Sequence, residues 1–169
     1  MLKFLCLLFI FSDVANAAQH KATFHSVEVS GAEENPYVDV KKSKGKTDIV
    51  WKTEVNQKSP PLKATFVFHF HNSEQTETTQ LENLCIEYEE GTTERSVQKY
   101  LLKALANADE CPIQNGTSLS VPHSFSLSFS TDDPLCGDVE NAFKVFKEMD
   151  SKKCQLLITG SSKGTVTGC

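Results

Sequence analysis

Arginine is almost missing from this chain of 169 residues, since Arg95 is the only one among 17 basic residues. The 22 acidic residues outnumber the basic ones, and the formal net charge is -5. Nucleic-acid binding needs clustered Lys and Arg to neutralise phosphates, so nucleic acid is not an expected partner. The small basic cluster at residues 41–46 contains Gly45, and we interpret it as a solvated turn.

The chain also lacks any hydrophobic run long enough to cross a bilayer, which takes about 20 apolar residues. The apolar run at residues 4–11 follows Lys3 and precedes the small-x-small signal at residues 15–17. This order predicts a secretory signal peptide at residues 1–17, removed after Ala17 or Ala18. We therefore expect residues 18–169 to form one secreted, extracellular domain, in a compartment where cysteines pair.

The chain lacks the short motifs of common enzymes, including the G-x-S-x-G elbow, the P-loop, the H-E-x-x-H helix and the dinucleotide fingerprint. Two histidines lie two positions apart in a predicted strand, but a metal needs a further ligand, so we expect no metal and no cofactor. A secreted hydrolase, the least favoured hypothesis, would depend on His69, His71, His123, Asp132 and Asp133. We expect no enzymatic activity.

The chain has six cysteines but lacks the spacing of a zinc site, because no two of the cysteines outside the predicted signal peptide lie within four residues of each other. Those five are Cys85, Cys111, Cys136, Cys154 and Cys169. A Cys85–Cys111 disulfide would close a loop of about 27 residues around a helical segment and contribute roughly 3–4 kcal/mol. A final hairpin turning near residue 150 favours Cys136–Cys169 over Cys136–Cys154. The odd count leaves one thiol free or paired between molecules.

The triplet Asn115-Gly116-Thr117 is an N-glycosylation acceptor. A glycan needs solvent, so this motif predicts a surface turn carrying a modified Asn115.

Alternating apolar residues predict strands on both sides of a helical segment. The predicted strands are residues 22–29, 37–40, 47–55, 63–71, 117–130 with a break at Pro122, 138–148 and 153–161. A turn at residues 149–152 would join the last two, and the tail after Gly160 is expected to be loose.

Between these strands, residues 93–108 carry apolar positions at helical spacing, with Thr92 or Thr93 as the cap. A shorter helix is predicted over residues 78–88, with Thr79 and Glu82 as a capping box. The expected fold class is mainly β: an antiparallel β-sandwich or cup with a short helical insertion at about residues 78–108.

Phenylalanine is abundant, with 11 in the chain. In residues 63–71 the phenylalanines alternate with other residues and therefore share one strand face. Such rings form either ordinary core or the lining of a lipid cavity, and the pattern leaves open which face looks inward. The candidate lining residues are Phe66, Phe68, Phe70, Phe125, Leu127, Phe129 and Phe143.

Several segments resemble a known family. Residues 84–85 (LC), an amphipathic helix and residues 111–116 (CPIQNG) resemble the ganglioside activator proteins and their insect relatives, among them the CheA/CheB chemosensory proteins of fly gustatory hairs. Residues 137–139 (GDV) stand at the family's G-x-Y position, with valine in place of the usual tyrosine. Residues 154–164 resemble the activator's last strand.

The resemblance covers residues 78–164 and, in outline, residues 20–70, while the family's amino-terminal cysteine partner is missing here. It implies an ML-like lipid-recognition β-cup that holds a lipid in a cavity between two sheets and has no catalysis of its own.

We therefore expect a secreted, non-enzymatic carrier of a lipid or hydrophobic chemosensory ligand such as a pheromone. The alternative is a secreted, disulfide-stabilised β-sandwich module that binds a protein receptor and has no lipid cavity. The expected partner is a hydrophobic small molecule, with a membrane receptor as a second candidate. The sequence leaves the oligomeric state open.

Overall fold

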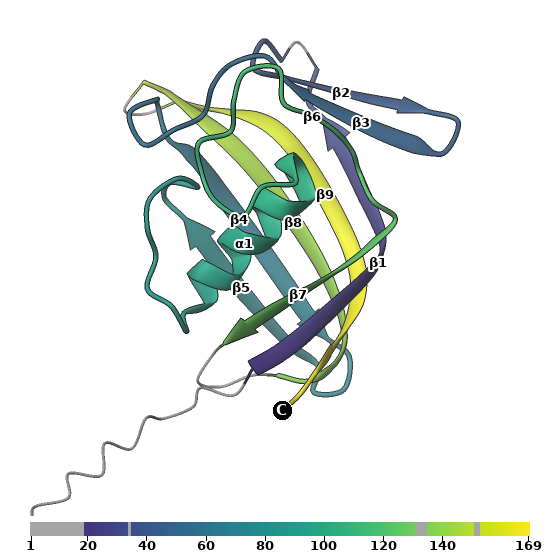
Figure 1. Cartoon of the computed structure of the whole chain (residues 1–169). Helices are drawn as coiled ribbons and strands as arrows, with labels where there is room; N and C mark the ends of the chain where they lie inside the picture. The colour runs from purple at the N-terminus through teal and green to yellow at the C-terminus, as the bar shows by residue number, and fades with distance from the viewer. Residues whose placement is uncertain (1–18, 34, 131–134, 151–152) are drawn as a thin grey trace, which may run out of the picture.

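The computed structural model describes residues 19–33, 35–130, 135–150 and 153–169. Two antiparallel sheets and one α-helix make up this part of the chain (Figure 1). The fold is mainly β, as the sequence predicts. Within the described ranges, no helix combines the length and the apolar character that a membrane span requires. The predicted signal peptide, residues 1–17, lies outside the described residues.

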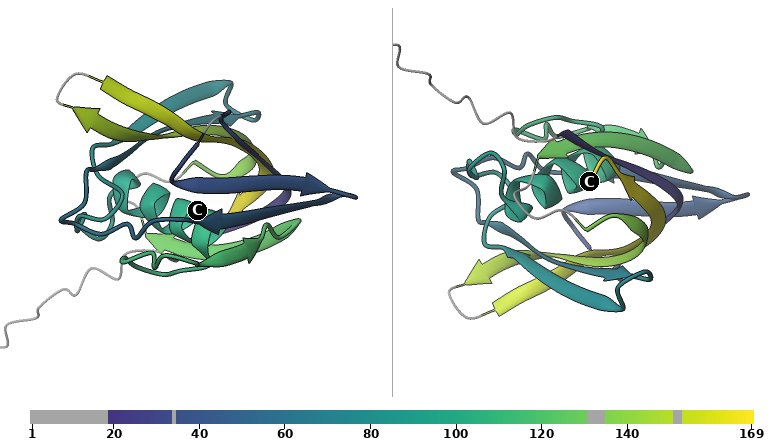
Figure 2. Two further views of the ribbon diagram at one scale, coloured as in Figure 1. Left: turned by 90° about the horizontal axis from the view of Figure 1, so that it is seen from above. Right: turned by 90° about the horizontal axis from the view of Figure 1, so that it is seen from below.

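The larger sheet has six strands in the order β5-β4-β8-β9-β1-β7 and curves around the helix (Figures 1 and 2). Its long strands twist and coil, which turns one face into a concave surface. The strands are β1 (Gln19–Gly31), β4 (Leu62–Phe70), β5 (Gln75–Leu81), β7 (Ser124–Ser130), β8 (Gly137–Asp150) and β9 (Lys153–Thr167).

The smaller sheet has the order β2-β3-β6, with β2 (Val38–Ser43), β3 (Lys46–Trp51) and β6 (Ser118–Ser120). Its β2–β3 hairpin projects from the body of the protein (Figure 2). Lys44 and Gly45 form the predicted two-residue turn with positive φ angles, 43° and 79°. The Trp51 indole N–H donates to the carbonyl of Leu105 at 2.9 Å, which attaches this sheet to the helix.

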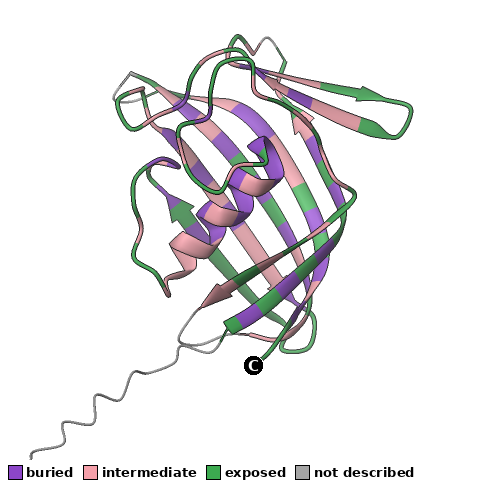
Figure 3. Ribbon diagram, viewed as in Figure 1, coloured by how far each residue is buried: buried purple, intermediate pink, exposed green. Residues whose placement is uncertain are grey.

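Helix α1 (Thr93–Ala106) lies across the concave face of the large sheet (Figure 1). It begins after Thr92, whose hydroxyl accepts a hydrogen bond from the backbone N–H of Arg95 at 3.2 Å. It ends at Asn107, which adopts the left-handed conformation. The apolar face is buried against the sheets, as Figure 3 shows, so packing as well as local propensity stabilises the helix.

The predicted structure of two segments is wrong. The helix expected over residues 78–88 is replaced by β5 and a loop, and Thr79 lies opposite Phe66 in the β4–β5 ladder instead of capping a helix. Pairing with β4 decides this segment, because its threonines fit a pleated edge better than a helix. The tail after Gly160 is not loose. It continues as β9 to Thr167, because β8 and β1 pair with it on both sides.

Two disulfides join parts of the chain that are distant in sequence. Cys85–Cys111 links the loop after β5 to the segment after α1, with a Cα–Cα distance of 5.5 Å. Cys136–Cys169 links the start of β8 to the end of β9, with 5.9 Å between the Cα atoms. Both are the pairs that the sequence favours, and the second follows from the hairpin register. Cys154 is free and exposed.

Candidate ligand-binding pocket

The middle of the concave face is a packed aromatic core. Phe66 of β4 and Phe143 of β8 are stacked with ring centres 6.0 Å apart. Tyr100 of α1 meets Phe66 edge-on at 5.0 Å and Phe143 at 6.0 Å. All three side chains are buried, so this region of the predicted cavity is filled by protein.

An apolar pocket lies beside this core, between α1 and the part of the sheet where β1 and β7 pair. Its free volume is about 70 Å³. Strands β1, β4 and β7 contribute Ala22, Phe24, Phe68, Phe70, Leu127 and Phe129. Ala22 and Phe24 meet Leu127 and Phe129 because β1 and β7 pair and these residues occupy inward positions at alternate residues along each strand. Phe68 and Phe70 come from β4, which β8 and β9 separate from β1, so the curvature of the sheet brings them to the same pocket.

The pocket also has a polar side. Thr93 and Ser96, in the first turn of α1, line it together with Glu77 of β5, which is exposed. Leu135 lines it as well. The polar side therefore reaches solvent, while the opposite side is formed by aromatic and aliphatic groups.

The predicted lining residues divide into two groups. Four of them line the pocket: Phe68, Phe70, Leu127 and Phe129. The other three belong to the packing around it. Phe66 and Phe143 form the core described above, and Phe125 packs against Phe24 and Tyr100 at 5.4 and 5.3 Å.

The expected position of the cavity is wrong. The resemblance implies a cavity between two sheets, whereas every strand residue that lines this pocket belongs to the six-stranded sheet. The smaller sheet lies against the other end of α1 through Trp51. The curved sheet, its helix and Leu135 of the segment before β8 enclose the pocket.

Several lining residues are absent from the sequence-based set, among them Ala22, Val97, Tyr100, Val139 and Val166. Val97 and Tyr100 could have been found, because they lie on the apolar face of the predicted helix. Their helical spacing does not show what that face contacts, and only the crossing of α1 over the sheet brings these two side chains to the pocket.

Two buried polar side chains, Asn141 and Ser162, lie behind the lining and are hydrogen-bonded to Tyr100, which lines the pocket. The hydroxyl oxygens of Tyr100 and Ser162 are 2.9 Å apart, and Ser162 donates to the Asn141 side-chain oxygen at 2.9 Å. Burial raises the pKa of Tyr100 to about 12, while its hydrogen bonds with Ser162 and Asn141 act in the opposite direction. The Tyr100 hydroxyl therefore stays protonated at neutral pH.

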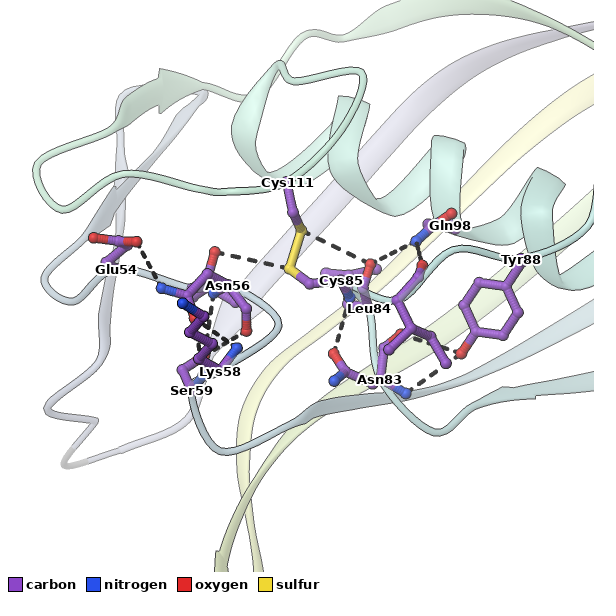
Figure 4. Close-up of a disulfide and its surroundings, with 12 residues drawn as sticks. Glu54, Asn56, Lys58, Ser59, Asn83, Leu84, Cys85, Tyr88, Gln98 and Cys111 are labelled. Carbon is purple, nitrogen blue, oxygen red and sulfur yellow. Dashed lines mark hydrogen bonds between the residues drawn. A yellow bond between two sulfur atoms is a disulfide. The ribbon is translucent and has the colours of Figure 1, made fainter.

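A second hollow, of about 530 Å³, surrounds the Cys85–Cys111 disulfide and is largely polar (Figure 4). Its polar groups serve the loop that follows β5. The Gln98 side-chain amide donates to the carbonyls of Leu84 and Ile86 at 2.8 and 2.7 Å, and its oxygen accepts from Arg95. These bonds fix the loop against α1 and engage the side chains of Gln98 and Arg95.

The histidines proposed for a hydrolase do not form one site. His69 contacts Thr76, and His71 lies 3.4 Å from Glu140. His123 borders a separate groove beside the β2–β3 hairpin. Asp132 and Asp133 lie outside the described residues. Across the described ranges, no cluster of three or more His, Cys, Asp or Glu is arranged to hold a metal ion.

The glycosylation motif lies where the sequence predicts. Asn115 is exposed, in the turn that precedes β6, and Gly116 adopts a positive φ of 84° there.

No protein-family model and no curated protein matches this chain. Among solved structures, the crystal structure of the C-terminal domain of wzt aligns with 84% of this chain and 77% of that chain. The TM-score is 0.32 and the sequence identity is 8%, which is too little likeness to carry an argument about fold or function.

Proposed function

We propose that this chain is a secreted, non-enzymatic binding protein that takes up the apolar end of a lipid or other hydrophobic small molecule in the pocket beside α1. The observation that carries the proposal is the convergence of Phe68, Phe70, Leu127 and Phe129 around free volume. Two disulfides support the extracellular setting, because such bonds persist in oxidising compartments. The resemblance to ganglioside activator proteins supports the ligand class.

The volume limits what this pocket can hold. Pockets for drug-sized ligands occupy about 300–1,000 Å³, and a dry cavity of about 150 Å³ binds benzene. A pocket of about 70 Å³ therefore takes the end of an aliphatic chain and not a whole lipid. Each buried methylene contributes about 0.8 kcal/mol, so the affinity for a chain stops rising with chain length once the pocket is filled.

The experiment uses the delipidated, disulfide-bonded protein with decanoic acid and 1-decanol as probes. Native mass spectrometry measures uptake, and NMR follows the methyl signals of Val97. Val97→Phe fills the pocket, and we expect it to reduce uptake at least about tenfold, since a pocket without free volume forfeits the methylene contacts. Val67→Phe, on the outer face of β4, is the matched control and should leave uptake unchanged.

A second function is supported by the packed core of Phe66, Phe143 and Tyr100 and by the small volume. It is a secreted module that presents its surface, with a glycan at Asn115, to a protein or membrane receptor. Under this function neither probe binds, the Val97 signals stay in place, and Val97→Phe alters nothing but stability.

A further inference from the structure

We infer that the pocket selects a ligand whose inner end carries a hydrogen-bond acceptor, such as the carbonyl oxygen of a ketone, aldehyde or ester, and that the side-chain amide of Asn141 is the donor. This inference rests on the proposed function and names the ligand class for the same pocket. An oxygen-bearing compound would then enter with its oxygen foremost.

The hydrogen bonds among the three buried polar side chains fix which group is left over. The Tyr100 hydroxyl lies 2.9 Å from the Ser162 hydroxyl and 3.5 Å from the Asn141 side-chain oxygen, to which Ser162 also donates at 2.9 Å. Whichever of these partners takes the tyrosine proton, the Asn141 oxygen only accepts, and its amide nitrogen takes no part in these bonds. The amide nitrogen of Asn141 is buried and has no hydrogen-bond partner among the described residues.

The position of Asn141 places this donor next to the pocket. Its partner across the β4–β8 ladder is Phe68, and two residues back along the inner face of β8 is Val139. Phe68, Val139 and Tyr100 all line the pocket, whereas Asn141 lies behind this lining with its amide nitrogen buried, so a ligand oxygen reaches that nitrogen only when a lining side chain moves aside. Asn141 is only 4% exposed, so its N–H groups cannot turn to bulk solvent.

The chemistry of this arrangement selects acceptors. A buried N–H without a partner is unfavourable, and a ligand oxygen that accepts from it removes that cost. An alkane of the same length fills the apolar lining but leaves the amide unpaired. The hydroxyl protons of Tyr100 and Ser162 are already donated, and only the amide nitrogen of Asn141 lacks a partner. A carbonyl oxygen, which accepts without donating, matches this nitrogen.

The test compares 2-pentanone with n-pentane, which share a five-carbon chain and differ in the carbonyl group. Protein NMR gives both dissociation constants from the Val97 and Val139 methyl signals. We expect Asn141→Leu to lower the preference for the ketone by roughly five- to tenfold, the range of one neutral hydrogen bond. Asn72→Leu, in the exposed turn between β4 and β5, is the control and should keep the preference.

The wild-type protein gives an independent readout that does not depend on how well the Asn141→Leu variant folds. With 2-pentanone, the side-chain N–H signals of Asn141 should shift and the carbonyl stretch of the bound ketone should fall to a hydrogen-bonded frequency. Tyr100→Phe should keep both signatures, because Asn141 and not the tyrosine contacts the ligand oxygen.

Two failures are distinguishable. Absence of any Val97 shift with either probe contradicts the proposed function itself. This inference alone is contradicted if both probes bind while the Asn141 amide signals do not shift and the carbonyl stretch keeps the frequency of a free ketone. In that case the amide holds a buried water.

Discussion

At the scale of single residues, Tyr100 combines contacts to four phenylalanine rings with a buried hydrogen bond. Its ring contacts Phe24, Phe66, Phe125 and Phe143, with centres between 4.8 and 6.0 Å away. Its hydroxyl nevertheless has a hydrogen-bond partner, which a buried tyrosine needs. Tyr100 thus belongs to the core, to the pocket lining and to the hydrogen-bonded group that it forms with Ser162 and Asn141.

This position makes stability depend on alkaline pH. The unfolded chain releases the Tyr100 proton near its ordinary pKa of 10.0, whereas the native protein keeps it to about 12. In between, the unfolded state binds fewer protons, so stability falls as pH rises. We expect Tyr100 to account for a loss of about 2 kcal/mol between pH 9 and pH 11.5 in urea unfolding.

The Tyr100→Phe variant lacks this titration and should lose correspondingly less stability over the same range. An equal loss in the two proteins would show that Tyr100 ionises as easily in the fold as in water.

Two glycines of β9 show a residue-scale feature that sequence reasoning missed. A Cβ on Gly160 would lie 2.6 Å from the Phe143 ring atom Cε1, and one on Gly164 would lie 2.8 Å from Cδ1 of Phe24. The rings therefore lie directly on the β9 backbone. In the sequence these glycines indicate a loose tail, because the partners that cover them come from β8 and β1.

At the scale of elements, α1 has a terminus that can be tested. Thr92 caps the helix, and its neighbour Thr93 begins it. We expect Thr92→Ala to lower the free energy of unfolding by about 1 kcal/mol, because the backbone N–H of Arg95 loses its partner. Thr93→Ala should change it by only a few tenths, as measured by chemical denaturation. Equal effects of the two substitutions would mean that the cap bond contributes nothing.

The helix was predictable and β5 was not, for a physical reason. The apolar face of α1 repeats within the helix itself, so local spacing reveals it. In β5 only Thr79 and Leu81 are buried, and pairing with β4 decides its conformation. The alternation of Phe66, Phe68 and Phe70 correctly indicates one face. Which of these rings stays in the core depends on where Tyr100 crosses the sheet, and local sequence does not encode that crossing.

At the scale of the whole molecule, Cys136–Cys169 ties the last strand into the sheet. The register places Gly137 opposite Val166, so the disulfide closes the open end of the β8–β9 hairpin. We expect the double substitution Cys136→Ser, Cys169→Ser to lower the free energy of unfolding by roughly 3–4 kcal/mol, because the unfolded chain regains the entropy of a closed loop. Urea unfolding of the oxidised protein measures the change.

Cys154→Ser is the matched control, since this thiol is exposed and unpaired. It should leave the midpoint of unfolding unchanged. A loss as large as that of the double variant would reassign the native disulfide.

Strand β7 stands at the end of the six-strand order, with β1 as its neighbour. Its sequence, SFSLSFS, carries no charge and no proline, which are two of the devices that prevent edge strands of natural proteins from pairing with other chains. The backbone along its outer side is a template on which the same segment of another molecule can stack. We therefore expect self-association of this protein at high concentration to begin at this edge of the large sheet.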